Sequence, residues 1–134
     1  MAQIQDKNIT LTWKTDDDVF IAGNEHLLTR LLSNLIGNAY RYGKNNGYIF
    51  VELSESPEQV VLSVKDNGIG ISSEDQKNIF QRFYRADKSR ASKGTGIGLA
   101  MVNEIAELHK GTISVNSILG EGSTFLFIIS KSPH

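Results

Sequence analysis

Residues 66–71 combine the residue types in this chain that are best suited to holding a flat, polar ligand. Their sequence is Asp-Asn-Gly-Ile-Gly-Ile, and they follow an apolar run, residues 60–64, that predicts a β-strand. Gly68 and Gly70 lack a Cβ, so the backbone there can turn sharply and lie close to a ligand. An ionised Asp66 only accepts hydrogen bonds, which suits the exocyclic amine of a purine. Taken alone, the stretch favours an ordinary Asp-Asn-Gly turn.

A second group of polar side chains lies on a predicted helix that begins after an N-cap at Asn24 and runs to about Tyr42. Aliphatic residues share one face of this helix at helical spacing, and Asn34, Asn38 and Arg41 share another. Asparagine is a weak helix former because its side chain competes for backbone hydrogen bonds, so two within one helix need a reason. The pattern is equally consistent with a polar solvent face and with a functional group.

A glycine-rich segment, residues 93–100, leads into a predicted amphipathic helix that runs to about His109 and is capped by Gly111. The segment before it, residues 84–93, carries several cations and no large aliphatic side chain, which predicts a mobile loop. The glycine spacing is Gly-x-Gly-x-Gly. It differs from the Gly-x-Gly-x-x-Gly of dinucleotide-binding domains, and we set that fold aside.

The remaining patterns predict strands and one short helix. Residues 9–13 and 19–22 are expected to form a hairpin around an exposed acidic turn, and residues 48–53 and 60–64 a second, antiparallel hairpin. Residues 112–116 and 124–129 are the last strands, and Ser72 caps a short helix that carries Ile79, Phe80 and Phe83. We therefore predict an α+β fold, a two-layer α/β sandwich in which three helices cover one face of a mixed sheet of about five strands.

Composition narrows the function classes. A chain of 134 residues with 40% hydrophobic and 22% charged residues predicts a single globular domain over residues 1–134. A net charge of −1 gives no reason to expect nucleic acid or an anionic membrane as a partner. The absence of cysteine excludes disulfides and thiolate metal sites, and it suits a reducing compartment. The Met-Ala start is typical of a piece cut from a longer protein.

Several motifs stand in a fixed order along the chain. They are N-L-I-G-N-A-Y-R-Y at 34–42, D-N-G-I-G-I at 66–71, I-F-Q-R-F-Y-R at 79–85, K-G-T-G-I-G-L-A at 93–100 and G-E-G-S-T-F at 120–125. Together they closely resemble the catalytic, ATP-binding domain of bacterial sensor histidine kinases, within the Bergerat-fold ATPases. The resemblance covers residues from about 8 to 129. The phenylalanine-rich motif is what separates histidine kinases from related ATPases.

The resemblance implies a nucleotide site. Asn38 would bind Mg²⁺ through its amide oxygen, Arg41 would meet phosphate oxygens, and Asp66 would accept a hydrogen bond from the adenine amine. Arg85 would reach the terminal phosphates, and Thr124 would lie beside adenine in the last strand. Asn34 and Arg85 are assigned to catalysis. The residues assigned to ATP binding are Asn38, Arg41, Tyr42, Asp66, Gly68, Gly70, Ile71, Phe83, Arg85, Lys93, Gly94, Thr95, Gly96, Gly98, Leu99 and Thr124.

The resemblance also implies a reaction, transfer of the γ-phosphate of Mg-ATP to a histidine on a separate dimerisation and phosphoacceptor domain. A response regulator would be the downstream partner. ATP-hydrolysing relatives are similar to one another in having a glutamate base where this chain has Asn34, and an amide cannot deprotonate water. The chain has no H-E-L-R-T-P-like motif, so we expect a monomeric fragment that binds ATP without phosphorylating itself. The parent protein is expected to be anchored in the bacterial inner membrane, with this domain on the cytoplasmic side.

Two other functions remain open. One is a serine/threonine protein kinase of the anti-sigma-factor type, against which the phenylalanine-rich motif and the long segment before residue 93 argue. The other is a module that only senses or scaffolds nucleotide, against which the complete motif set argues.

Overall fold

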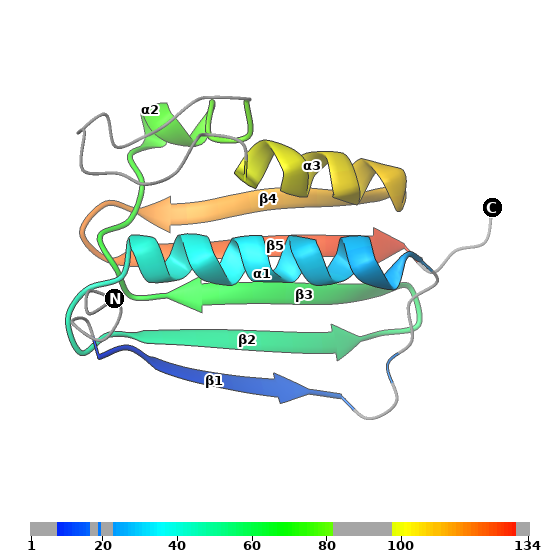
Figure 1. Ribbon diagram of the computed structural model, residues 1–134, viewed down its shortest axis with the longest axis horizontal. Coiled ribbons are helices and arrows are strands. Elements are labelled where there is room, and N and C mark those ends of the chain that lie inside the picture. Colours follow the sequence, from blue (N-terminus) through cyan, green and yellow to red (C-terminus); the bar gives the residue numbers. More distant parts are fainter. Residues whose placement is uncertain (1–7, 17–18, 20–22, 82–97, 131–134) are drawn as a thin grey trace.

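The computed structural model describes residues 8–16, 19, 23–81 and 98–130, and it contains a sheet with the strand order β1-β2-β3-β5-β4 (Figure 1). The elements are β1 (Thr10–Thr15), α1 (Glu25–Arg41), β2 (Tyr48–Glu55), β3 (Gln59–Asp66), α2 (Ser73–Gln76), α3 (Gly98–Leu108), β4 (Gly111–Ile118) and β5 (Gly122–Ser130). The β1–β2 pair is parallel and the other pairs are antiparallel. The helices lie over one face of the sheet (Figure 1), which confirms the predicted two-layer α+β architecture.

The first strand pairs differently from the prediction. β1 lies parallel to β2, with Thr10 opposite Tyr48 and Thr15 opposite Leu53. Asp16 extends this pairing, since its carboxylate accepts a hydrogen bond from the Glu55 N–H at 2.8 Å. Residues 20–22, most of the second strand of the expected hairpin, lie outside the described residues. The sequence missed the β1–β2 pair because its strands are far apart along the chain and connected through α1.

Helix α1 forms as its sequence predicts. The Asn24 side chain caps it by accepting a hydrogen bond from the Leu27 N–H at 3.0 Å. Leu31, Leu35 and Ala39, spaced four residues apart, are buried against the sheet and α3. None of the helices in the described ranges is long and apolar enough to cross a membrane.

The short helix after residue 72 is shorter than expected. Ser72 caps it, because its hydroxyl accepts a hydrogen bond from the Asp75 N–H at 3.1 Å. The helix ends at Gln76, and the chain continues through turns with i to i+3 hydrogen bonds, such as Asn78 N–H to Asp75 O. Phe80 lies in the last of these turns and packs edge-on against Phe125, with ring centroids 6.2 Å apart.

The end of α3 also differs from the prediction. The residue with a left-handed backbone is Lys110, with φ +58°, whereas Gly111 already begins β4. His109 ties this end of α3 to the start of α1. Its Nε2 accepts a hydrogen bond from the Asn24 N–H at 3.0 Å, and its Nδ1 lies 2.8 Å from the carbonyl oxygen of Ile105. This arrangement requires a neutral ring whose proton is on Nδ1, because a carbonyl oxygen only accepts.

Replacing His109 with Leu should lower the free energy of unfolding by about 0.5–1.5 kcal/mol, since the Asn24 N–H loses its protein acceptor. Urea unfolding of the purified chain measures this loss. His26 is exposed on α1, so His26→Leu serves as the control and should change stability by less than about 0.5 kcal/mol. Equal losses in the two variants would show that the His109 bond does not stabilise the fold.

Candidate functional site

Asp66 is a buried carboxylate at the end of the central strand β3. Its side chain is 4% exposed, and one carboxylate oxygen accepts a hydrogen bond from the Gly68 N–H at 2.8 Å. Burial raises the pKa of Asp66 above its ordinary value of 3.8, and the backbone N–H groups of Gly68 and Ser123 oppose that shift. The surrounding backbone therefore fixes the position of a group whose remaining lone pairs can only accept hydrogen bonds.

The loop after Asp66 is clamped on both sides by the chain's own backbone. The Ile69 N–H donates to the Tyr42 carbonyl at 3.0 Å, and the Ile69 carbonyl accepts from the Gly120 N–H at 2.6 Å. A Cβ on Gly68 would collide with the Tyr42 carbonyl oxygen, and one on Gly70, whose φ is +76°, with that of Ile118. The glycines are thus needed first for packing between the end of α1 and the β4–β5 turn, which meet here (Figure 1). Their predicted contact with a ligand stays a prediction.

Ser123, which the sequence did not single out, lies next to Asp66 on the neighbouring strand β5 and faces the same side of the sheet. The two residues are opposite each other in the β3–β5 register, and Ser123 is 5% exposed. Thr124 pairs with Lys65 and Asn116, so the pleat places it on the other face of the sheet. The prediction that Thr124 lies beside the base therefore does not agree with the strand register. The burial of Phe125 and Phe127, at alternate positions from Ser123, is the pattern that could have shown that Ser123 and not Thr124 shares the face of Asp66.

The polar face of α1 begins with Asn34, near the start of α3, and continues toward the C-terminus of α1. Asn34 is half-buried, its amide nitrogen lies 3.7 Å from the Met101 sulfur, and its amide oxygen lies close to Gly98. Asn38 follows one turn later and is also half-buried. Within the described ranges, the structure gives the Asn38 amide no hydrogen-bonding partner. A free amide oxygen at this place could bind a hard cation such as Mg²⁺.

Arg41 and Tyr42 end this helix. Arg41 is exposed in the last turn, with its guanidinium carbon 6.0 Å from the centroid of the Tyr42 ring. Tyr42 is the C-cap, and its carbonyl accepts the Ile69 N–H described above. The end of α1 is therefore attached directly to the loop that follows Asp66. Asn38 and Arg41 belong to the last turn of α1, so this attachment places them at the same end of the helix as the loop after Asp66.

The other predicted site residues fall into two groups. Ile71 is buried in the core, with its N–H donating to the Ser117 hydroxyl at 2.8 Å, and Gly98 and Leu99 begin α3. Six others lie outside the described residues: Phe83, Arg85, Lys93, Gly94, Thr95 and Gly96. The loop predicted to be mobile, residues 84–93, lies there too.

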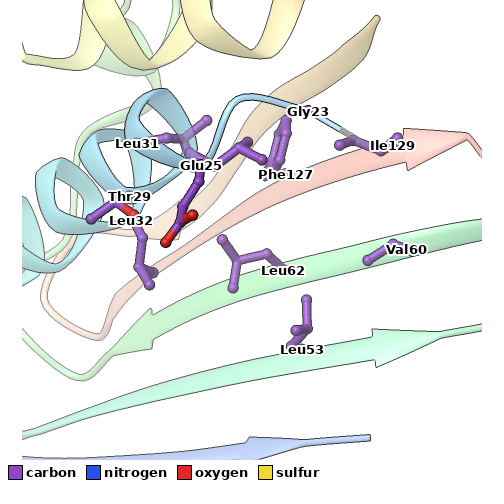
Figure 2. Close-up of a pocket in the computed structure, with 11 residues that line it drawn as sticks. Gly23, Glu25, Thr29, Leu31, Leu32, Leu53, Val60, Leu62, Phe127 and Ile129 are labelled. Carbon is purple, nitrogen blue, oxygen red and sulfur yellow. The ribbon is translucent and has the colours of Figure 1, made fainter. Parts of the chain in front are cut away.

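An apolar pocket of about 350 Å³ lies at the opposite end of α1 (Figure 2). It is lined mainly by aliphatic side chains, among them Leu32 from α1, Leu53 from β2 and Leu62 from β3. Few polar groups converge there. Glu25 and Thr29 are the polar side chains in its lining, and no cation is among the described residues that line it, so the pocket offers no positive charge to an anionic ligand.

Folding stability should depend on pH through Asp66. Because its folded-state pKa is raised above 3.8, its contribution to stability is fully present below that value and is lost as the pH rises through the folded-state pKa. We expect the wild type to gain stability relative to Asp66→Asn as the pH falls from 7 toward about 4. Urea unfolding of both chains over this range measures the difference. If the wild type instead lost stability relative to Asp66→Asn as the pH fell, a raised pKa of Asp66 would be contradicted.

Comparison with known proteins identifies the family of this chain. The family model described as histidine kinase-, DNA gyrase B- and HSP90-like ATPase matches residues 23–133. The sensor histidine kinase RppB of Synechocystis sp. is 44% identical over 110 residues, which cover 81% of this chain and 24% of RppB. The sensor histidine kinase WalK of Bacillus subtilis is 39% identical over 118 residues, 85% of this chain and 19% of WalK. The chain thus spans about a quarter or less of these relatives.

Solved structures share the fold. The catalytic domain of the histidine kinase ThkA has a TM-score of 0.81 and 29% identity, covering 98% of this chain and 86% of that one. Full-length ShkA in complex with AMPPNP has a TM-score of 0.80 and 29% identity, covering 92% of this chain and 26% of ShkA. ThkA in complex with the response regulator TrrA has a TM-score of 0.75 and 26% identity, covering 98% of this chain and 36% of ThkA. These matches confirm the resemblance to histidine kinase catalytic domains, and the chain belongs to the histidine kinase-, DNA gyrase B- and HSP90-like ATPase family.

Proposed function

We propose that this chain binds Mg-ATP and supplies its γ-phosphate to a histidine on a separate dimerisation and phosphoacceptor domain. The observation that carries the proposal is the buried Asp66 carboxylate, fixed by backbone N–H groups at the point where β3, the end of α1 and the β4–β5 turn meet. The relatives of this chain are sensor histidine kinases, and the structure of ShkA was solved with AMPPNP, an ATP analogue. Both facts support a nucleotide as the ligand.

In this proposal Asp66 accepts a hydrogen bond from the adenine amine. Asn38 supplies an amide oxygen to Mg²⁺, and its half-buried, unpartnered state among the described residues suits that role. Bound Mg²⁺ would neutralise charge on the phosphates. Arg41, Arg85 in the predicted loop and the glycines at positions 94, 96 and 98 that follow this loop would meet the phosphate oxygens.

Asn34 supports transfer rather than hydrolysis. It sits one helical turn before Asn38, beside the start of α3. An amide at this position can orient a ligand but cannot take a proton from water, so the site lacks a base there. In phosphoryl transfer, positioning and charge neutralisation supply most of the catalysis, and the described residues suit both tasks.

The acceptor histidine would come from outside this chain. Both ring nitrogens of His109 are used in the contacts with Asn24 and Ile105, and His26 is exposed on α1 away from Asp66. We propose the phosphoacceptor domain of the parent kinase as the direct partner and a response regulator as the later one, which the ThkA–TrrA complex supports. We also propose, from the family resemblance, that this domain is monomeric and works on the cytoplasmic side of a membrane-anchored parent.

Calorimetry with ATP, ADP and GTP, with and without Mg²⁺, tests nucleotide binding. We expect ATP to bind, GTP to bind much more weakly, and Mg²⁺ to raise the affinity for ATP. Incubation with γ-labelled ATP and a separately produced phosphoacceptor domain should then give an acid-labile label, and the chain alone should give none. An acid-stable label would indicate a serine/threonine kinase instead, and a chain that binds no nucleotide would refute the proposal.

A further inference from the structure

We propose that Ser117 is a positioning residue, which holds the Ser123 hydroxyl as a hydrogen-bond acceptor beside Asp66. It thereby makes the site select a purine with an exocyclic amine over one with a carbonyl oxygen in its place. This inference rests on the proposed nucleotide binding at Asp66. It adds a residue that no motif identified, since Ser117 lies on β4, before the Gly-Glu-Gly-Ser-Thr-Phe motif.

The hydrogen bonds of Ser117 leave one consistent arrangement of its proton. Its hydroxyl accepts from the Ile71 N–H at 2.8 Å and lies 2.9 Å from the Gly122 carbonyl oxygen, which can only accept. The single hydroxyl proton of Ser117 therefore goes to Gly122. The Ser117 and Ser123 hydroxyl oxygens are 2.7 Å apart, so the proton between them must come from Ser123.

The Ser123 hydroxyl has therefore already donated its proton to Ser117, and toward a ligand it can only accept hydrogen bonds. It lies opposite Asp66 in the β3–β5 register, on the same face of the sheet, and both side chains are buried. Side chains paired in this way have Cβ atoms about 4.5–5.5 Å apart, which is close enough to share one ligand group directly or through one water. Two neighbouring acceptors suit an amine with two N–H donors. A carbonyl oxygen in the same place would face lone pairs from both sides, a mismatch that buried sites reject strongly.

Gln76 also holds Ile71 and Ser117, but it contacts their backbone carbonyls and not the Ser117 or Ser123 hydroxyl. The Gln76 side-chain amide donates to the Ile71 carbonyl at 2.8 Å and to the Ser117 carbonyl at 3.0 Å. Its loss would loosen the attachment of α2 to β4 but would leave the proton of Ser123 on its present acceptor. Gln76→Ala is therefore a control for a merely structural effect.

The test compares ATP with inosine triphosphate, which carries an oxygen in place of the amine, by calorimetry with Mg²⁺. In Ser117→Ala the Ser123 hydroxyl loses its acceptor and can turn its proton toward the ligand. We expect ATP to bind about 5–10-fold more weakly, inosine triphosphate to bind no more weakly than in the wild type, and the preference for ATP to fall by about tenfold. Ser117→Thr keeps the hydroxyl and should keep the preference. Gln76→Ala should weaken both nucleotides equally or not at all.

A second variant keeps the inference testable if Ser117→Ala does not fold. Ser123→Ala leaves the Ser117 bonds to Ile71 and Gly122 intact, and it should lose the same preference for ATP. A wild type that binds both nucleotides equally, or a Ser117→Ala chain that weakens both to the same degree, would overturn the inference while leaving the proposed function standing. A wild type that binds no nucleotide would instead refute the proposed function.

Discussion

Replacing Asp66 with Asn should reduce the affinity for ATP by at least about 100-fold and leave a folded chain. The carbonyl oxygen of the new side chain can still accept the Gly68 N–H, but its NH₂ group replaces the other carboxylate oxygen, which can only accept hydrogen bonds. That NH₂ donor would face the donors of the adenine amine. An unpaired buried donor costs about 1–3 kcal/mol, and here both the protein and the ligand would carry one.

Calorimetry with ATP measures this loss, and circular dichroism with urea unfolding checks the fold. The loss should be the same with and without Mg²⁺, because Asp66 is proposed to contact the base and not the phosphates. Glu121 is an exposed acid in the β4–β5 turn, so Glu121→Gln removes the same charge nearby and should change the affinity less than twofold. A folded Asp66→Asn chain that binds ATP as well as the wild type would place the base elsewhere.

The elements that the sequence predicted well are those set by local contacts. α1 has its cap, its apolar stripe and its end within one continuous stretch, and the β2–β3 hairpin joins neighbouring strands. The β1–β2 pair is parallel and depends on α1 as its connection, so no short-range pattern indicates it. The cap of α3 was predicted one residue late. Glycine is the commonest residue in a left-handed C-terminal cap, so Gly111 was chosen, but Lys110 has the left-handed backbone.

The site divides in the same way. Asp66 closes a strand that the sequence identifies, and Asn34 and Asn38 share a face of a predicted helix, so their arrangement follows from local periodicity. Thr124 was assigned from the family resemblance, and Ser123 was not considered. A shift of one residue along a strand moves a side chain to the other face, and only the register with Asp66 reveals it. Ser117 could not be found from the sequence, because its role depends on hydrogen bonds to three residues in two other segments, the loop after β3 and the start of β5.

The sequence also showed that Gly68 and Gly70 were needed, but not why. It suggested close approach to a ligand, whereas the structure places the backbone carbonyls of Tyr42 and Ile118 where their Cβ atoms would be. Close approach between backbone segments and close approach to a ligand require the same residue type. A structure is needed to tell these two explanations apart, and both can apply to the same glycine.

Replacing Asn38 with Ala should remove the part of ATP affinity that depends on Mg²⁺ and leave the rest. The variant deletes one half-buried amide on α1, whose oxygen is proposed as the protein's ligand to the cation. With Mg²⁺ present we expect ATP to bind at least about tenfold more weakly, a loss of about 1.4 kcal/mol. Without Mg²⁺ the affinity should stay within about twofold of the wild type, since alanine is a good helix former and α1 persists.

Calorimetry under both conditions separates this variant from Asp66→Asn, which should lose affinity equally in each. Asn38→Asp offers a matched variant, because its carboxylate retains an oxygen ligand and should preserve a dependence on Mg²⁺. Asn45→Ala, at an exposed position between α1 and β2, controls for the loss of an amide and should bind ATP normally. If Asn38→Ala lost affinity to the same degree with and without Mg²⁺, the amide would be acting on the nucleotide or on the fold rather than on the cation. The division of the site into a base-binding end at Asp66 and a metal-binding end at Asn38 would then be wrong.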